Sequence, residues 1–334
     1  MNRFLLIRLS SLGDIIHTLP AFSVLREKNT ESRITWLVEE KGKEILDCIP
    51  GIDKIVVLKQ KKNVKQILNV RQKIREKNQI VFDFQGLLKS AFFAALSGAR
   101  RRIGFSRKNL REPAASFFYN DRLKPFPENI HVIDKNLKLL SKLGLEKTGD
   151  YSFPLVLPED IEKETENKLH KFGIKAGIPF ILVNVGAAWE SKRWSAEKWI
   201  QTIGLLSAEK KPIILLWGSI PEQKLAEKIA AKTKVPMAPF LSIKEVLAWL
   251  KRAALVISGD TFALHAACAL GRPVVGIFGP TDPQRNGPIG LRKQVVFHAL
   301  ECSKCYKRKC SRMDCLETIS PDEVFEKSRE LLKP

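Results

Sequence analysis

The sequence predicts an α/β protein built from two doubly wound domains. Short apolar runs alternate with helical patterns along the chain, which is typical of βαβ units and parallel sheets. The pattern restarts in the second half, and a length of 334 residues allows two domains that each bury a core. Pro154 and Pro158 interrupt regular structure between the halves, so we expect domains at 1–155 and 156–334 with the hinge near 151–159.

In the first half, each apolar run is short enough for a buried strand and precedes a segment with helical spacing. The expected strands are Phe4–Leu9, Ile34–Val38, Lys54–Leu58 and Ile80–Phe84, and the expected helices cover 15–28, 63–77, 86–96 and 131–144. Gly144 ends the last of these helices, because glycine readily adopts the left-handed conformation of a helix C-cap.

The second half repeats the alternation. The expected strands are Phe180–Val185, Ile213–Trp217, Leu255–Ser258 and Val274–Phe278, and the expected helices lie near 196–209, 222–232, 243–252 and 262–270. In doubly wound domains ligands bind at the carboxyl ends of the strands, so the loops that follow these strands are the candidate sites.

The net charge of +21 indicates an anionic partner, either phosphate-rich or a membrane surface. The segment 59–111 contains 15 Lys/Arg and 2 Asp/Glu, so its excess of +13 is local. A lysine-rich proteome is the alternative explanation. A basic nucleic-acid-binding protein is a further alternative, but the chain has no recognised nucleic-acid module and its basic segment lacks interleaved aromatics.

We expect a cytoplasmic protein, because no apolar run approaches the roughly 18 residues of a membrane span and no secretion signal is evident. Cys48 and Cys268 stand alone in apolar surroundings, as core cysteines do. The other four form a C-x2-C-x4-C-x4-C cluster, for which zinc binding, redox behaviour and plain thiols all stay open. These four are Cys302, Cys305, Cys310 and Cys315.

Asp14 follows the first expected strand in the stretch Arg8–Asp14 (RLSSLGD). Gly13 would permit a tight turn there, and a helix N-terminus offers unpaired N–H groups. Asp14 would then project into the cleft between the domains. The alternative is that Asp14 caps its helix, a common role for aspartate.

Lys192 and Arg193 follow the strand that ends near Val185. A lysine supplies a point charge and an arginine a planar fork, a combination that suits a diphosphate. The alternative is a solvated pair of cations.

Asp260 and Thr261 follow another buried strand and lead directly into an apolar helix that contains His265. Backbone amides at 261–263 could bind phosphate at the positive end of the helix, and Asp260 could accept hydrogen bonds from sugar hydroxyls. A lone histidine such as His265 is more often a core residue than a ligand. With too few histidines for a metal site, the residues indicate a two-domain enzyme for a phosphorylated or nucleotide ligand.

Five motifs together resemble the ADP-heptose:lipopolysaccharide heptosyltransferases. They cover nearly the whole chain in family order, and the Arg-Glu-Pro motif favours the heptosyltransferase I type. The motifs are Ser10–Ala21 (SSLGDIIHTLPA), Asp83–Ser90 (DFQGLLKS), Arg111–Asn120 (REPAASFFYN), Gly259–His265 (GDTFALH) and Phe278–Pro283 (FGPTDP).

The resemblance implies a GT-B architecture, two Rossmann-like doubly wound domains facing across a central cleft, and transfer of heptose from ADP-heptose to Kdo with inversion. No cofactor or metal would be required. Asp14 would be the general base and Lys192 would stabilise the leaving ADP. The implied donor-binding residues are Glu222, Asp260, Thr261, Phe262, Ala263 and His265, and the implied acceptor-binding residues are Ser11, Gly13, Lys61, Lys62, Lys65, Gln85 and Arg111.

The implied partners are ADP-heptose, Kdo-lipid A and the cytoplasmic face of the inner membrane, with the enzyme acting as a peripheral monomer and without nucleic acid. Ala187 and Ala188 replace hydroxyl residues often seen before the loop lysine, and Phe262 replaces a usual glycine. Heptosyltransferase II, or transfer of another core sugar from a nucleotide donor, is therefore kept as the alternative.

Overall fold

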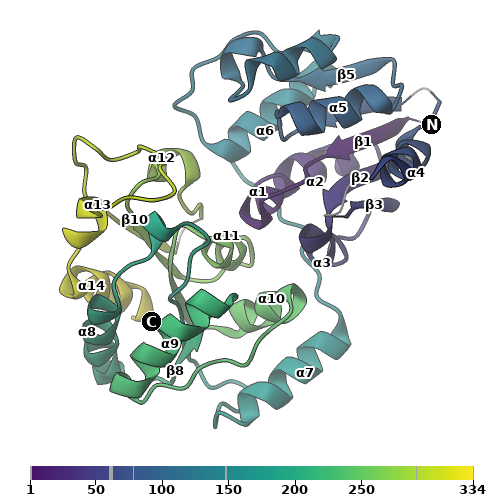
Figure 1. The fold of residues 1–334 in the computed structure, drawn as a ribbon. Helices are drawn as coiled ribbons and strands as arrows, with labels where there is room; N and C mark the ends of the chain where they lie inside the picture. Colours follow the sequence, from purple (N-terminus) through teal and green to yellow (C-terminus); the bar gives the residue numbers. More distant parts are fainter. Residues whose placement is uncertain (1, 60–62, 78, 147–148, 291, 334) are drawn as a thin grey trace. The chain divides into compact units, whose positions relative to one another are not determined.

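The computed structural model describes residues 2–59, 63–77, 79–146, 149–290 and 292–333. The chain divides into two compact units, residues 1–156 (unit 1) and 157–334 (unit 2). The division falls one residue from the boundary expected from Pro154 and Pro158. Each unit is a parallel α/β sheet with helices on both faces (Figure 1).

Unit 1 contains a six-stranded parallel sheet in the order β3-β2-β1-β4-β5-β6. Its strands are β1 (Arg3–Ile7), β2 (Arg33–Glu39), β3 (Lys54–Leu58), β4 (Gln79–Asp83), β5 (Arg101–Gly104) and β6 (Asp121–Arg122). Phe4 of β1 lies between Ile34 and Ile80 of its two neighbours. The four expected strands are present. The short strands β5 and β6 were not predicted, because they are rich in charge and carry no apolar run.

The helices of unit 1 are α1 (Leu12–Ile16), α2 (Leu19–Lys28), α3 (Lys43–Leu46), α4 (Val64–Ile74), α5 (Leu88–Leu96) and α6 (Val132–Leu140). Short 3-10 helices lie at η1 (Glu40–Gly42), η2 (Arg107–Asn109), η3 (Pro113–Phe118) and η4 (Ser141–Leu143). The single helix expected over 15–28 is wrong: the chain breaks between α1 and α2, because Pro20 has no N–H to continue the first helix. Gly144 adopts the left-handed conformation expected of a C-cap.

Unit 2 contains a five-stranded parallel sheet in the order β11-β10-β9-β7-β8. Its strands are β7 (Ile181–Asn184), β8 (Ile213–Leu216), β9 (Leu255–Gly259), β10 (Val274–Phe278) and β11 (Lys293–Phe297). The helices are α7 (Glu159–His170), α8 (Ala196–Leu206), α9 (Ile220–Thr233), α10 (Ile243–Arg252), α11 (Phe262–Ala269), α12 (Pro283–Asn286), α13 (Asp314–Glu317) and α14 (Pro321–Leu332), with 3-10 helices η5 (Glu190–Lys192) and η6 (Ser207–Glu209). The four strands and four helices expected here are present, whereas β11, α7 and α14 were not predicted.

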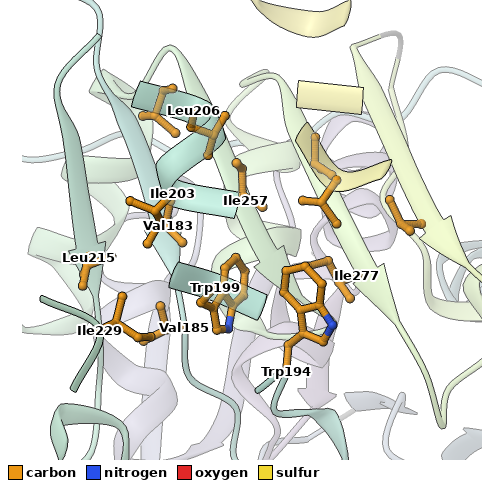
Figure 2. Close-up of a cluster of buried hydrophobic side chains, with 14 of the residues drawn as sticks. Val183, Val185, Trp194, Trp199, Ile203, Leu206, Leu215, Ile229, Ile257 and Ile277 are labelled. Atoms are coloured by element: carbon orange, nitrogen blue, oxygen red, sulfur yellow. The ribbon is translucent and has the colours of Figure 1, made fainter. Parts of the chain in front are cut away.

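The core of unit 2 lies between this sheet and the helices α8, α9 and α14. Alternate strand residues such as Val183 and Ile257 point to this face, as the period of a strand requires. Figure 2 shows Trp194 beside Trp199, whose rings meet edge to face at 5.0 Å between centroids. The Trp194 indole donates to the carbonyl of Leu316, so this aromatic pair fixes the loop before α8.

Each sheet has a point where the strand order reverses. In unit 1 this switch point lies between β1 and β4, and in unit 2 it lies between β7 and β9. Loops that leave adjacent strands in opposite directions open a crevice there, where doubly wound folds bind their ligands. No helix within the described residues is both long enough and apolar enough to span a membrane.

Candidate active site

The switch point of unit 1 holds an ion pair between Arg8 and Asp14. Arg8 follows β1 and is buried, and its Nη2 lies 2.7 Å from Asp14 Oδ1. Its Nη1 donates to the carbonyl of Phe84, just after β4. The guanidinium therefore joins the ends of the two strands and holds the Asp14 carboxylate beside them.

The second oxygen of Asp14 accepts hydrogen bonds from Ser11. The Ser11 backbone N–H lies 3.1 Å from Oδ2 and its hydroxyl lies 3.0 Å away. Desolvation by the surrounding protein would raise the pKa of Asp14, but the Arg8 cation and these hydrogen bonds hold that pKa below its ordinary value. Asp14 therefore caps α1 as the alternative interpretation expected, yet its side chain stays 36% exposed as a carboxylate. The capping contacts leave it accessible to a ligand.

Gln85 fixes the loop that carries these residues. Its Oε1 accepts from the N–H groups of Leu9 at 3.1 Å and Ser10 at 3.3 Å. Asp83 in turn accepts from the Gln85 N–H, and burial raises the pKa of Asp83. Gly13 is buried within α1 and does not have a positive φ, so the tight turn expected there is wrong.

Of the other acceptor candidates, Lys65 and Arg111 lie elsewhere in unit 1. Lys61 and Lys62 fall outside the described residues. Lys65 is exposed in the first turn of α4, and Arg111 is exposed in the loop before η3. Among described residues, no hydrogen bond or ion pair connects Lys65 or Arg111 to Asp14. The structure thus brings Ser11, Gln85 and Asp14 together, but it does not add these cations to the cluster.

The switch point of unit 2 holds a second buried ion pair, between Lys192 and Asp260. Lys192 ends η5, and its Nζ lies 2.6 Å from Asp260 Oδ2 and 3.1 Å from the Asp260 carbonyl. The same ammonium lies 4.4 Å from the centroid of the Trp189 ring. The Lys192 side chain is only 14% exposed, so the solvated-cation alternative does not describe it. Arg193 instead donates to the carbonyl of Ala187.

Asp260 accepts hydrogen bonds from several other protein donors as well. His265 Nε2 lies 2.9 Å from Oδ1, and the Thr281 hydroxyl donates to Oδ2 at 2.7 Å. Burial would raise the pKa of Asp260, but His265 and then Lys192 hold that pKa well below its ordinary value. Both carboxylate oxygens help to position Lys192, His265 and Thr281, and the expectation that Asp260 also binds sugar hydroxyls stays a prediction.

Asn184 joins the strands on either side of this switch point. It ends β7, and its amide donates to Ser258 Oγ at 2.9 Å and to Thr261 Oγ1 at 3.1 Å. Thr261 is the N-cap residue of α11, with Phe262 and Ala263 in the first turn. The positive end of α11 therefore opens at the site. Neither Asn184 nor Thr281 was predicted as a site residue, although Asn184 is the polar end of an apolar strand and Thr281 lies in the loop that follows another, a signal that would have found them.

Glu222 lies in the first turn of α9 and extends toward the end of β7. Its Oε2 accepts the N–H of Gly218 at 2.8 Å. A Cβ atom on Gly186 would stand 2.4 Å from Glu222 Cδ, so a side chain at position 186 would displace the Glu222 carboxylate. This close approach fixes the Glu222 carboxylate beside the loop that leads to Lys192.

The four clustered cysteines are free thiols in the structure. Cys302, Cys305 and Cys310 are exposed and Cys315 is buried. Among the described residues, no group of three or more His, Cys, Asp or Glu is placed to hold a metal ion. Burial and the neighbouring thiols raise the pKa of Cys315.

Two doubly wound units with parallel sheets place this chain in the GT-B fold class. A glycosyl transferase family 9 structure from Veillonella parvula matches 99% of this chain and 97% of its own with a TM-score of 0.85, at 22% identity. An Escherichia coli heptosyltransferase solved with ADP-2-deoxy-2-fluoro heptose matches 98% of this chain and 99% of its own with a TM-score of 0.77, at 24% identity.

The particular family follows from the sequence comparison. Residues 67–316 match glycosyltransferase family 9 (heptosyltransferase), and the chain belongs to that family. It is 30% identical to a lipopolysaccharide heptosyltransferase 1 from Campylobacter coli, over 98% of both chains. It is 29% identical to a lipopolysaccharide heptosyltransferase 1 from Pseudomonas aeruginosa, over 98% of this chain and 92% of that one.

Proposed function

We propose that this enzyme transfers L-glycero-D-manno-heptose from ADP-heptose to Kdo of the lipopolysaccharide inner core. The observation that carries the proposal is the buried Lys192 cation at the switch point of unit 2. The chain that holds it is similar to heptosyltransferase 1 proteins over 98% of its length. The enzyme would act as a monomer in the cytoplasm, at the surface of the inner membrane where its lipid acceptor resides.

In the proposed reaction, a Kdo hydroxyl oxygen attacks C1 of the heptose from the face opposite the diphosphate. The new C1–O bond forms as the bond from C1 to the phosphate oxygen breaks, so the anomeric centre inverts and ADP leaves with the bonding electrons. Asp14 takes the hydroxyl proton, a role supported by its ionised and 36% exposed carboxylate. Ser11, Gln85 and Arg8 would hold it in place.

Lys192 would stabilise the negative charge that develops on the leaving ADP. Its contacts to Asp260 use two of the three N–H donors of an ammonium group, which leaves one for a phosphate oxygen. The first-turn amides of α11, at Phe262 and Ala263, would add donors on the same side. Glu222 would accept hydrogen bonds from the nucleoside.

The acceptor would be held by cations of unit 1. Lys65 and Arg111 are exposed and are candidates for the Kdo carboxylates and lipid phosphates, together with Lys61 and Lys62. Transfer by a heptosyltransferase II, or of a different core sugar, is the second candidate. Ala187, Ala188 and Phe262 alter the groups that would meet the donor, so they favour the form of this candidate in which a different sugar is transferred.

The test is ADP release from a panel of nucleotide sugars, each with and without Kdo-lipid A. The proposal expects release with ADP-heptose that depends on the acceptor and is reduced at least about 10²-fold in Lys192→Ala. Lys198→Ala is the matched control, because Lys198 has similar exposure but bonds the backbone carbonyls of Leu316 and Ile319. Release with an acceptor that already carries the first heptose, and none with Kdo-lipid A, would overturn the heptosyltransferase I assignment.

A further inference from the structure

We propose that unit 1 docks on an anionic membrane through three exposed apolar side chains and two adjacent cations. The apolar residues are Leu88, Phe92 and Phe117, which are 43%, 41% and 74% exposed. The cations are Arg107 and Lys108, both exposed. We call these five residues the docking surface. The inference rests on the proposed function only in that a lipid acceptor brings the enzyme to a membrane.

The elements that carry the docking surface pack directly on one another. Leu88 and Phe92 lie one turn apart on α5, so they share a side of that helix. Helix η3, which contains Phe117, packs against both α5 and η2. The Leu88 N–H donates to Glu112 at 2.7 Å, which ties the start of α5 to the residue before η3. Figure 1 shows α5 on the outside of the sheet of unit 1.

The exposure of these side chains is not a by-product of loose packing. The opposite side of α5 is fully buried through Ala91, Phe93 and Ala94. On η3 the residues before Phe117 are buried, at Ala115 and Ser116, and the Ser116 hydroxyl donates to the Pro113 carbonyl within the same helix at 2.7 Å. Phe117 is therefore exposed on a helix whose other side is packed against the protein.

The charges beside the apolar groups select the partner. The Arg107 guanidinium carbon lies 5.7 Å from the centroid of the Phe117 ring, so a cation and an apolar group occupy one spot. Neither Arg107 nor Lys108 forms an ion pair with a described residue. Interfacial membrane contacts combine two features: apolar side chains enter the headgroup layer, and neighbouring cations bind lipid phosphates. We therefore assign an anionic bilayer to this surface.

The experiment measures flotation of the full chain with vesicles of phosphatidylglycerol and phosphatidylcholine, and with phosphatidylcholine alone. Binding is expected to the anionic vesicles and to weaken with salt. Phe92→Ser with Phe117→Ser should lower binding at least about tenfold, because each phenylalanine loses its apolar contact with lipid. Arg107→Gln with Lys108→Gln should lower binding to anionic vesicles about tenfold or more at low salt. Phe240→Ser is the matched control, because Phe240 is a phenylalanine of unit 2 that is 67% exposed, and this variant should bind as the wild type does.

Equal vesicle binding by the wild type and the Phe92/Phe117 double variant would overturn the inference. The inference would also be overturned if the chain bound single-stranded nucleic acid more tightly than anionic vesicles at 200 mM salt and the double variant lost that binding. The surface would then belong to another partner. Turnover of a water-soluble acceptor separates the two proposals. The docking variants should turn over this acceptor at the wild-type rate. Failure of the proposed reaction would therefore show as absent turnover in the wild type, whereas failure of the docking proposal would show only in the flotation experiment.

Discussion

Replacing Arg8 by glutamine should raise the pH below which the enzyme loses its activity. Arg8 is the charged partner of Asp14, at 2.7 Å, and it holds the pKa of that carboxylate below its ordinary value. Asp14 must be ionised to accept the acceptor's proton, so the wild type should keep its activity down to a pH below the ordinary range of a carboxylate. Without the guanidinium, the Ser11 hydrogen bonds stay but the opposite charge is lost.

The size of the shift follows from the geometry. A cation within about 4–6 Å lowers the pKa of a carboxylate by roughly 1–3 units. Arg8→Gln should therefore raise the pKa of Asp14 by about that amount. The pH at which kcat/KM falls in acid, its acid limb, should move up by the same amount. Arg8→Lys keeps the charge, so its acid limb should lie near that of the wild type.

The assay is acceptor-dependent ADP release across pH, with kcat/KM measured in each buffer at constant ionic strength. Arg26→Gln is the control, because Arg26 also pairs with an aspartate of unit 1, Asp53 at 2.5 Å, outside the Arg8–Asp14 cluster. A purely structural role for Arg8 would lower activity at every pH and leave the acid limb in place. An unmoved limb in folded Arg8→Gln would refute the reasoning.

Three other predictions concern the two clusters. Asp14→Asn should lower kcat by about 10²–10⁴-fold while the thermal shift produced by ADP-heptose stays unchanged; full activity would remove Asp14 as the base. Asp260→Asn should cost about 3–5 kcal/mol in urea unfolding at neutral pH, because Lys192 loses its buried partner. Since the pKa of Asp260 is depressed, its stabilising contribution is present above the unfolded value of about 3.9 and is lost as pH falls through the lower folded value. The gap between wild type and variant should close in acid, and a constant gap would contradict this. Gly186→Ala should weaken ADP-heptose binding, measured by calorimetry, because the added methyl group displaces Glu222. In the double variant with Glu222→Ala, the loss of binding free energy should be smaller than the sum of the two single losses. Additive losses would show that the two residues act separately.

Local pattern was enough to predict most of the fold. The alternation of buried strands with helical spacing gave eight of the strands, and Gly144 ended its helix as expected. The elements that were missed have a physical reason: β5 and β6 are short and charged, so no apolar run marks them. The break between α1 and α2 was missed because apolar spacing continues across it, although Pro20 cannot continue a helix.

The site shows the same division between local and tertiary information. Position at a strand end and residue chemistry were sufficient to select Asp14, Lys192 and Asp260, because polar groups after buried strands have few structural uses other than caps and ligands. The partners of these residues could not be read in this way. Lys192 and Thr281 reach Asp260 from loops 68 and 21 residues away.

The sequence by itself therefore determined that this chain has two parallel α/β units, and it predicted which strand-end loops carry the candidate site residues. Tertiary structure alone decided that Arg8 pairs with Asp14 and that Asp260 pairs with Lys192. The reason is strand order. Which loops meet at a switch point depends on how the crossovers place β1 beside β4 and β7 beside β9, and spacing along the chain does not fix that placement.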